Sequence, residues 1–478
     1  MATISTHLES KTARTWVLAL ASIASFMVAL DTLVVSTSLT TIRGDLGASL
    51  EQLEWTVNAY NLSFAVLLMT AAALGDRFGR RRVFAAGLGL FSVASAACAL
   101  APDVGALIAA RAVQGVGAAL VLTLALALVS AAFPPERRGS ALGIYFAVTG
   151  LAVASGPFIG GAIAEGLAWE WIFWLNVPIG LAAIPFVRAR IRESFGPDTA
   201  LDLVGLALVT GGALGVVWGL VRGNAAGWDS FEVVGTLAAG VLLTIAFVAW
   251  ELRTREPMLP MRFFRSRAFS AGNTAIFFTF ASLFAAVFFF AQFLQSGLGY
   301  GPFDAGLRLL PWTATLFFVA PIAGALVDRI GERPFMAGGL FLQAVGMAWI
   351  ATIAEPELAY AEMIPPLIVA GIGVSAAIPA AQNSVVGAVP AEAIGKAAGT
   401  NSTMRELGGV FGIAVAVAVF AGAGSYASAA AFSDGFAPAI AVSAGLSLIG
   451  ATAGLALPGR RSPKGAPPAE PVPALETE

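Results

Sequence analysis

Long apolar runs, separated by short polar breaks, follow one another along almost the whole chain. Each run is close to or above the 20 residues that a helix needs to cross the hydrocarbon core of a bilayer, and too long for a barrel strand. The runs lie near residues 16–40, 54–74, 83–101, 104–131, 139–164, 171–188, 203–221, 233–251, 269–295, 303–327, 335–353, 362–388, 397–422 and 437–457. The pattern predicts an all-α integral membrane protein with fourteen transmembrane helices.

The composition agrees with a membrane protein and excludes several other classes. Hydrophobic residues make up 58% of the 478 residues and charged residues 12%, against roughly 25% charged residues in soluble domains. These values exclude an ordinary soluble enzyme, a nucleic-acid-binding protein and a disordered chain. Cys98 and His7 are the only cysteine and histidine, which excludes an intrachain disulfide and a metal centre built from either residue. We therefore expect no metal and no cofactor.

Basic residues are concentrated in alternate connections between the runs. With the N-terminus in the cytoplasm, 23 of the 27 lysines and arginines fall in inner segments, as the positive-inside rule requires, and the exceptions are Arg43, Arg111, Arg222 and Arg308. The outer connections instead carry Glu51, Glu54, Glu165, Glu170, Asp229, Glu232, Glu355 and Glu357. The alternation predicts cytoplasmic termini in a multi-pass protein of a bacterial inner membrane. The tail 1–13 is polar, and the Pro-rich tail 458–478 is expected to be disordered.

Two short patterns occur twice at nearly the same spacing. Leu74-Gly75-Asp76-Arg77-Phe78-Gly79-Arg80 is repeated as Leu326-Val327-Asp328-Arg329-Ile330-Gly331-Glu332, 252 positions later. Ala132-Phe133-Pro134-Pro135-Glu136 is repeated as Ala388-Val389-Pro390-Ala391-Glu392, 256 positions later. The spacing predicts two parallel six-helix halves, 14–192 and 269–457, with two extra helices between them at 203–251. A solute site between such halves, near the midplane, is typical of transporters.

Several motifs follow one another along the chain. They are Leu30-Asp31-Thr32, Asp76-Arg77-Phe78-Gly79-Arg80-Arg81, Arg111-Ala112-Val113-Gln114-Gly115-Val116-Gly117, the set Gly150, Gly156, Pro157, Gly160 and Gly161, Trp171-Ile172-Phe173, Asn176-Val177-Pro178-Ile179-Gly180, and Arg405 with Gly408-Gly409. Together they resemble the fourteen-helix drug:proton antiporters of the major facilitator superfamily, the QacA/EmrB type. The resemblance spans nearly the whole chain apart from the tails. It implies the major facilitator fold, and it makes the glycines and Pro157 the motif associated with antiporters.

The resemblance also implies a cytoplasmic gate at the loop after the second run and at its repeat. The residues of this gate are Asp76, Arg77, Gly79, Arg80, Asp328 and Arg329. An acid beside an arginine cluster can form an ion pair between helices that breaks when a transporter opens. Anchoring of the arginines at the membrane surface is the alternative, although it does not explain the Asp-Arg-x-Gly pattern. Glu332 replaces the expected base in the second copy, so we expect weaker pairing there.

Three charged residues inside apolar runs are the candidates for proton coupling and substrate binding: Asp31, Arg111 and Glu406. A charge at membrane depth costs about 2.5–3.5 kcal/mol on insertion scales, so each must face a cavity or a partner. Asp31 lies roughly 22 Å along its helix, past the midplane. The resemblance makes Arg111 part of a proton relay, and an inert ion pair is the alternative. Glu406 is a candidate cationic-substrate or second-proton site, which the adjacent Arg405 is expected to neutralise only partly.

Other polar residues at membrane depth are candidates for lining a cavity: Asn58, Asn61, Gln114, Gln292, Gln295, Arg308 and Arg405. Hydrogen bonds between helices explain the amides equally well. Arg308 is expected to attract an anionic group or to pair with an acid such as Asp31, and Glu165 to be a gate or capping residue. Eight phenylalanines occur between Phe277 and Phe293. We expect most of them to face lipid and a few to line an apolar drug pocket.

The leading functional hypothesis is a proton-driven exporter of lipophilic, partly cationic drugs that works by alternating access as a monomer. A proton-coupled exporter of one metabolite and an uptake symporter on the same fold are the alternatives. An ATP-driven pump or a membrane enzyme is disfavoured, because no Gly-x-x-x-x-Gly-Lys-Ser/Thr loop is present and no soluble segment is long enough to bind ATP. The expected partners are a small lipophilic molecule, protons and lipid, and not nucleic acid. The sequence does not identify the natural substrate.

Overall fold

A computed structural model describes residues 2–196, 201–389 and 394–458, and the elements in these ranges are helical. The N-terminal part, residues 2–196, contains α1 (Ala2–Leu46), α2 (Leu50–Phe78), α3 (Arg80–Ala99), α4 (Val104–Ala132), α5 (Pro135–Gly166), α6 (Trp171–Trp174) and α7 (Asn176–Arg190). Two further helices follow, α8 (Leu203–Ala226) and α9 (Phe231–Glu251).

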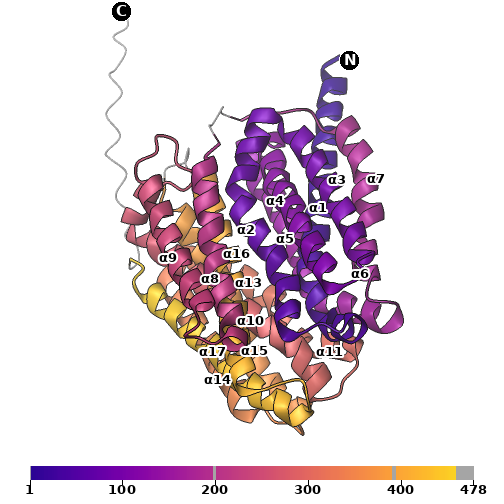
Figure 1. Ribbon diagram of the computed structural model, residues 1–478. Coiled ribbons are helices and arrows are strands. Elements are labelled where there is room, and N and C mark those ends of the chain that lie inside the picture. Colours follow the sequence, from indigo (N-terminus) through magenta and orange to yellow (C-terminus); the bar gives the residue numbers. More distant parts are fainter. Residues whose placement is uncertain (1, 197–200, 390–393, 459–478) are drawn as a thin grey trace, which may run out of the picture.

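The C-terminal part, residues 261–458, begins with the short 3₁₀ helix η1 (Met261–Arg265). It continues with α10 (Arg267–Gln292), the π-helical turn η2 (Phe293–Gly297), α11 (Pro302–Arg308), α12 (Leu310–Thr313), α13 (Thr315–Ile330), α14 (Glu332–Ile353), α15 (Tyr360–Val386), α16 (Ile394–Ala423) and α17 (Ala429–Leu455). Figure 1 shows the two parts side by side, with α8 and α9 at the edge of the bundle.

Within the described ranges, thirteen helical stretches are long and apolar enough to cross a membrane. They coincide with thirteen of the fourteen runs in the sequence. The remaining run, 139–164, forms the 32-residue helix α5, which is not among the thirteen. The prediction of an all-helical membrane protein is therefore confirmed, whereas the count of fourteen spans stays a prediction.

Polar residues in the connections begin several of the helices. Ser49 and Gln52 form a reciprocal capping box at the start of α2, and Asp103 caps α4 through the backbone N–H of Ala106 at 2.9 Å. Such caps satisfy backbone donors that the first helical turn leaves free. The polar breaks in the sequence therefore set the helix boundaries as well as the loops.

The two ends of the helix bundle differ in charge. One end, here called the basic end, carries the α2–α3, α7–α8 and α9–α10 connections, with Arg77 to Arg82, Arg188 to Arg192, and Arg253 to Arg267. The other, the acidic end, carries connections or helix termini with Asp45, Asp103, Glu170, Asp229, Glu355 and Glu357. The residues at the two ends are those whose alternation along the sequence predicted the orientation of the chain in the membrane.

The largest hydrophobic cluster that joins the two parts lies toward the acidic end. One buried cluster there contains Leu39 and Phe173 from the N-terminal part together with Phe290 and Ile440 from the C-terminal part. Toward the basic end, one cluster consists of residues from α1 to α7 and its following residue Ile191, and another of residues from the C-terminal part. The described structure is thus closed at the acidic end, and its two parts have separate cores toward the basic end.

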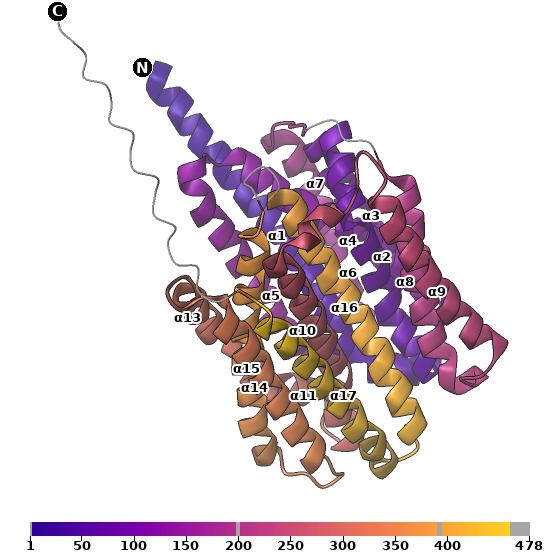
Figure 2. The same cartoon turned by 90° about the vertical axis from the view of Figure 1, so that its left-hand side faces the viewer.

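Helix α8 lies across one side of the junction between the parts. Its Val217 and Val221 pack in one cluster with Val66 of α2 and with Val410 of α16. Figure 2 shows α8 beside α2 and α16, with α9 on the outside. The two extra helices therefore contact both parts through α8.

The turns after α2 and after α13 have the same backbone geometry. Gly79 has φ of 101° and Gly331 has φ of 103°, and each ends one helix and begins the next. A side chain is strained at such a φ, so glycine is required in both turns. The two glycines are 252 positions apart and share this conformation, which supports the internal repeat inferred from the sequence.

The prediction that most phenylalanines near residues 277–293 face lipid is wrong. Phe288, Phe289, Phe290 and Phe293 are at most 1% exposed, and the other four are half-buried. The reason is that α10 is a central helix, which packs against α1, α15, α16 and α17. Phe290 of α10 and Phe293 of η2 both pack on Phe436 of α17, and the Phe293–Phe436 ring centroids are 4.0 Å apart.

Candidate functional site

Asp31 and Arg111 form an ion pair in the interior of the N-terminal part. The Nη1 atom of Arg111, on α4, donates to Oδ2 of Asp31, on α1, at 2.5 Å, and both side chains are 1% exposed. The Nε atom of Arg111 donates to the backbone carbonyl of Thr56 on α2 at 3.1 Å. Removing a charge from water is tolerated at this depth only with such partners. The structure therefore brings together two of the three charged residues singled out in the sequence.

Amide and hydroxyl side chains complete this site. Gln114 accepts from Arg111 Nη1 at 2.7 Å through Oε1, and its Nε2 donates to Asp31 Oδ1 at 2.9 Å. Asn176, at the start of α7, also donates to Asp31 Oδ1, at 2.8 Å. Ser95 of α3 accepts from Gln114 at 2.7 Å. Asp31 thus accepts three hydrogen bonds from two other helices, α4 and α7.

Aromatic rings enclose the guanidinium of Arg111. Its central carbon lies 4.1 Å from the ring centroid of Tyr60 and 5.7 Å from that of Phe173. Such rings favour a cation above their faces and keep water away from it. Binding of a proton to Asp31 would remove the anion that holds Arg111, so the arrangement can convert protonation into a change of contacts between α1 and α4.

Glu406 lies in the C-terminal part, on α16, and is 3% exposed. Arg405 holds its carboxylate through Nε at 2.8 Å and Nη2 at 2.7 Å. Both contacts go to Oε1, so these adjacent residues pair through one carboxylate oxygen, and the expectation that Arg405 neutralises Glu406 only partly stays a prediction. Arg405 itself is 30% exposed.

The whole chain is similar to known membrane transporters. The profile of the Major Facilitator Superfamily matches residues 21–413 and 274–476. The chain belongs to the major facilitator superfamily. Curated relatives include the tetracenomycin C resistance and export protein of Streptomyces glaucescens, 35% identical over 84% of this chain and 75% of the relative. The multidrug resistance protein Stp of Mycobacterium tuberculosis is 34% identical over 83% of this chain and 74% of the relative.

Solved structures confirm the fold. A crystal structure of a D-xylose–proton symporter superposes with a TM-score of 0.65 at 16% identity, over 92% of this chain and 96% of that one. A peptide-transporter-family structure bound to a thioalcohol-conjugated peptide superposes with a TM-score of 0.69 at 15% identity, over 90% of this chain and 94% of that one. At these identities the likeness concerns the fold alone, which is the major facilitator fold.

The superfamily's signature loop, between α2 and α3, is ordered by contacts to the segment after α7. Asp76 near the end of α2 pairs with Arg80, the first residue of α3, at 2.8 Å. Glu193 instead accepts from the backbone N–H of Arg81 at 2.8 Å and pairs with the side chains of Arg81 and Arg82. The Asp76–Arg80 pair thus joins α2 to α3. The link from this loop to the segment after α7 is made by Glu193, which sequence reasoning missed because it lies outside the motif.

The other gate residues differ in how they are placed. Arg77 is exposed, and its guanidinium lies 5.5 Å from the ring of Phe78. In the second copy Arg329 is exposed at the end of α13, whereas the side chain of Asp328 lies outside the described residues. The first copy of the loop is therefore the one whose contacts the structure shows.

The glycines of the antiporter motif have different surroundings. A side chain at Gly160 would overlap Thr37 and Val34 of α1, and one at Gly161 would overlap Pro302 and Phe303 of α11. No atom outside the local helix lies within 4 Å of a side chain added at Gly150. Gly156 is buried, and the side chain of Pro157 lies outside the described residues. Two of the glycines thus allow α5 to approach both α1 and the C-terminal part closely.

Two of the predicted cavity residues instead join the two parts at the acidic end. Gln295 of η2 donates to the carbonyl of Thr37 at 2.9 Å and accepts from the hydroxyl of Thr40. Gln292 accepts from Tyr426, whose ring lies 4.1 Å from the guanidinium carbon of Arg43. Burial raises the pKa of Tyr426, so its hydroxyl stays a donor.

Two charged residues at the acidic end lie close to the α10–α11 connection. Glu165 accepts from the backbone N–H of Phe303 at 2.9 Å, so it caps α11, consistent with the capping alternative. Arg308 does not pair with Asp31. It pairs with Asp304 at 2.9 Å and lies 3.7 Å from the ring centroid of Tyr300, because Asp31 is deep in the N-terminal part and already bound to Arg111.

The remaining predicted cavity residues lie on α2 and are fully buried. Asn58 and Asn61 are 0% and 1% exposed. Glu54, assigned from the sequence to an outer connection, is instead inside α2 and 0% exposed. The signal that could have found it is the spacing of Glu54, Asn58 and Asn61, which places all three on one helix face.

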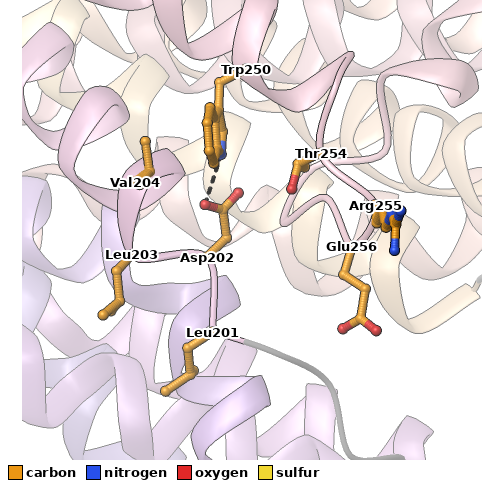
Figure 3. Close-up of a pocket in the computed structure, with 8 residues that line it drawn as sticks. All are labelled: Leu201, Asp202, Leu203, Val204, Trp250, Thr254, Arg255 and Glu256. Atoms are coloured by element: carbon orange, nitrogen blue, oxygen red, sulfur yellow. Dashed lines mark hydrogen bonds between the residues drawn. The ribbon is translucent and has the colours of Figure 1, made fainter.

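An open cavity of about 430 Å³ lies elsewhere, at the basic end beside the extra helices. Figure 3 shows Trp250 donating to Asp202 at its edge, a hydrogen bond of 2.9 Å, with Thr254 and Glu256 across from them. None of the site residues predicted from the sequence lines this cavity. It is therefore separate from the Asp31–Arg111 site.

Proposed function

We propose that this superfamily member exports lipophilic, partly cationic drugs or antibiotics from the cytoplasm in exchange for protons. The observation that carries the proposal is the fully buried Asp31–Arg111 pair, because a carboxylate held by a cation inside the membrane can exchange that partner for a proton. The names of the relatives, which describe tetracenomycin C export and multidrug resistance, support a drug as the substrate.

The proposed mechanism uses the difference in hydrophobic packing between the acidic end and the basic end. The acidic end faces outward and is closed in this conformation, while the separate cores at the basic end admit substrate from the cytoplasm. After substrate enters, the parts rock, the acidic end opens and substrate leaves. Proton binding to Asp31 then weakens its contact with Arg111 and favours the return. One charge moved down the membrane potential supplies about 2.3 kcal/mol per 100 mV.

Glu406 supplies the second charged group of this mechanism. Its only ion-pair partner among the described side chains is Arg405, which is 30% exposed and can be displaced by a cationic substrate. Phe280 and Phe284, half-buried on α10, are near this position, since Arg405 lies 5.6 Å from the ring of Phe280. An apolar cation would therefore find both a carboxylate and aromatic surface there.

The topology that this mechanism requires has fourteen spans, with α5 as the span between α4 and α6. We place the two halves at 14–192 and 269–457, the extra pair at 203–251, and both termini in the cytoplasm of a bacterium. The protein would act as a monomer in the inner membrane, with the proton gradient in place of a cofactor. The positive-inside distribution at the basic end supports this orientation.

The first test is ethidium flux in proteoliposomes under an imposed pH gradient. Wild type is expected to move ethidium against its gradient, and Asp31→Asn to lose this movement by at least about tenfold, because an amide cannot exchange a proton. Asp45→Asn, a change of the same chemistry at the exposed end of the same helix, is the matched control and should keep wild-type flux.

The outcomes separate the alternatives. Uptake driven by the pH gradient would overturn export in favour of a symporter. Full proton-driven export by Asp31→Asn would move the coupling group to Glu406. Flux that ignores the pH gradient in both proteins would contradict proton coupling.

A further inference from the structure

One face of α2 carries polar side chains that the Asp31–Arg111 site does not use. Glu54, Asn58 and Asn61 follow each other at i, i+4 and i+7, which is one face of a helix. All three are at most 1% exposed and lie within the membrane-spanning stretch Leu50–Phe78. Buried polar groups in this position need partners.

One oxygen atom of Glu54 and one of Asn58 have no donor, and neither the nitrogen nor the oxygen of the Asn61 amide has a partner among the described residues. The Nδ2 atom of Asn58 donates to Oε1 of Glu54 at 3.1 Å. Among the described residues, the other carboxylate oxygen, Oε2 of Glu54, has no hydrogen-bond partner, and neither has Oδ1 of Asn58. Both atoms are acceptors, and they belong to the same two side chains that already share one hydrogen bond.

We propose that Glu54 carries a proton in this conformation and donates it to Asn58. A protonated carboxyl has one O–H donor, and an amide has both a donor and an acceptor. One proton on Oε2 therefore completes a cyclic acid–amide pair, in which Asn58 donates to Oε1 and Glu54 donates to Oδ1. The step is the addition of one proton from the aqueous phase to a carboxylate, with no other bond formed or broken.

The charges around α2 offer no cation as an alternative partner. No ion pair with Glu54 exists within the described residues, and its nearest charged neighbour is Glu51, which has the same sign and is held by Arg222 of α8. Of the charged groups deeper in the helices packed against α2, Asp31 is paired with Arg111, and Arg405 with Glu406. Arg43 of α1 lies against Tyr426. Adding one proton to Glu54 is thus the change that gives Oε2 of Glu54 and Oδ1 of Asn58 a hydrogen bond to each other.

The acid–amide pair lies where the two parts meet. On α2, at about 100° per residue, this face lies between Leu62 and Val66 on one side and Leu53 and Val57 on the other. Leu62 and Val66 pack with Val410 and Ala414 of α16, while Leu53 and Val57 share a cluster with Ile413 and Val417 of α16. The polar face is therefore covered by α16, from the C-terminal part.

This position gives the proton a role that differs from coupling. If the acidic end opens by alternating access, as the proposed function requires, α16 leaves the polar face and Glu54 meets outside water. When the acidic end closes again, Glu54 takes up one proton from the outside, and when that end opens the proton returns to the outside. Glu54 therefore makes closure of the outer end depend on external pH, and it leaves the number of protons exchanged per substrate unchanged.

Infrared spectroscopy of the purified full-length protein tests the protonation itself. At pH 7, wild type is expected to show the carbonyl stretch of a buried, protonated carboxyl that Glu54→Gln lacks. Glu51→Gln, one turn away on the same helix and 31% exposed, is the matched control and should retain the band. Absence of this band in wild type, or its retention in Glu54→Gln, would overturn the proposal. The measurement does not depend on transport.

Distances between spin labels test the link to closure. Labels replace Leu100 and Glu357, which are exposed at the acidic end of the two parts, in a Cys98→Ser background. The ratio of closed to open protein should rise by up to about tenfold for each unit of acidification in wild type and Glu51→Gln. In Glu54→Gln, where an amide permanently replaces the acid, the ratio should respond less steeply, by up to about tenfold for each pH unit, and the response that remains comes from Asp31.

Parallel titrations in wild type and Glu54→Gln would contradict the proposal. Ethidium flux separates this failure from that of the proposed function. Proton-driven export that Glu54→Gln retains, with unaltered dependence on external pH, would leave the exporter intact and remove the role of Glu54. Absence of proton-driven flux in wild type would remove the exporter, while the infrared band still decides whether Glu54 is protonated.

Discussion

At the scale of the residue, the environment of Asp31 shows why a charge is stable inside this bundle. Its carboxylate accepts from Arg111, Gln114 and Asn176, which come from α4 and α7, and Arg111 has further acceptors of its own. A buried ion pair of this kind is costly to break from one side, because the remaining charge keeps its desolvation penalty and loses its partner. Loss of one charged partner is therefore expected to destabilise the contacts of the other.

The first prediction at this scale concerns Arg111→Gln. The change leaves the carboxylate of Asp31 without its cation and is expected to lower the free energy of unfolding by about 3–5 kcal/mol. Thermal unfolding in detergent measures this loss. The double variant Asp31→Asn/Arg111→Gln removes both charges and should recover most of the stability while it stays inactive in ethidium export. Additive losses in the double variant would show that the pair is not coupled.

At the scale of the element, α5 shows how glycine position controls the contact between helices. The sequence identifies five motif positions on this helix, but only the structure distinguishes Gly160 and Gly161, which touch α1 and α11, from Gly150, which has open space. Small residues allow such close backbone approach inside a membrane. The closed acidic end therefore depends on two of the glycines.

The prediction at this scale compares Gly161→Leu with Gly150→Leu. Leucine at 161 overlaps the backbone of Pro302 and Phe303, so it should prevent closure of the acidic end and reduce ethidium export at least about tenfold. A Cβ atom at 150 meets no neighbour within 4 Å, so the variant with leucine there should export at close to the wild-type rate. Both variants change glycine to the same good helix former, so equal effects would contradict the proposed contact.

At the scale of the whole molecule, the division of the hydrophobic core describes the conformation. The two parts share the largest cluster toward the acidic end and a small one beside α8, whereas two further clusters toward the basic end belong to one part each. Hydrogen bonds between Gln295 and α1 reinforce the shared side. Since packed cores are rigid, a change of conformation must separate the shared cluster and join the other two.

The prediction at this scale uses cysteine pairs in a Cys98→Ser background. Thr40→Cys with Gln295→Cys should form a disulfide readily, because these residues are in contact, and the disulfide should block export until it is reduced. Phe133→Cys with Val389→Cys, at the basic end and in separate clusters, is the matched pair and should cross-link slowly. Gel mobility after mild oxidation measures both. Equally fast cross-linking at both ends would contradict the one-sided closure.

Much of the architecture was predictable because a bilayer imposes simple rules on sequence. Apolar runs of about 20 residues, the charges between them and the paired glycines at Gly79 and Gly331 predicted the helices, the difference between the two ends and the repeat. The same rules singled out Asp31 and Arg111, since charge at membrane depth is rare. Each of these features depends on whether a segment lies in lipid or in water, so the sequence of that segment is enough to predict it.

Partnerships between distant side chains were decided by the tertiary structure alone. Asn176 completing the site of Asp31, Glu193 holding the signature loop, and Arg308 pairing with Asp304 depend on which helices are neighbours. The same is true of the phenylalanines of α10, which are buried because that helix is central, and of Glu54, which α16 covers. Hydropathy identifies a segment that avoids water, but lipid and protein interior are equally apolar, so only packing distinguishes the two.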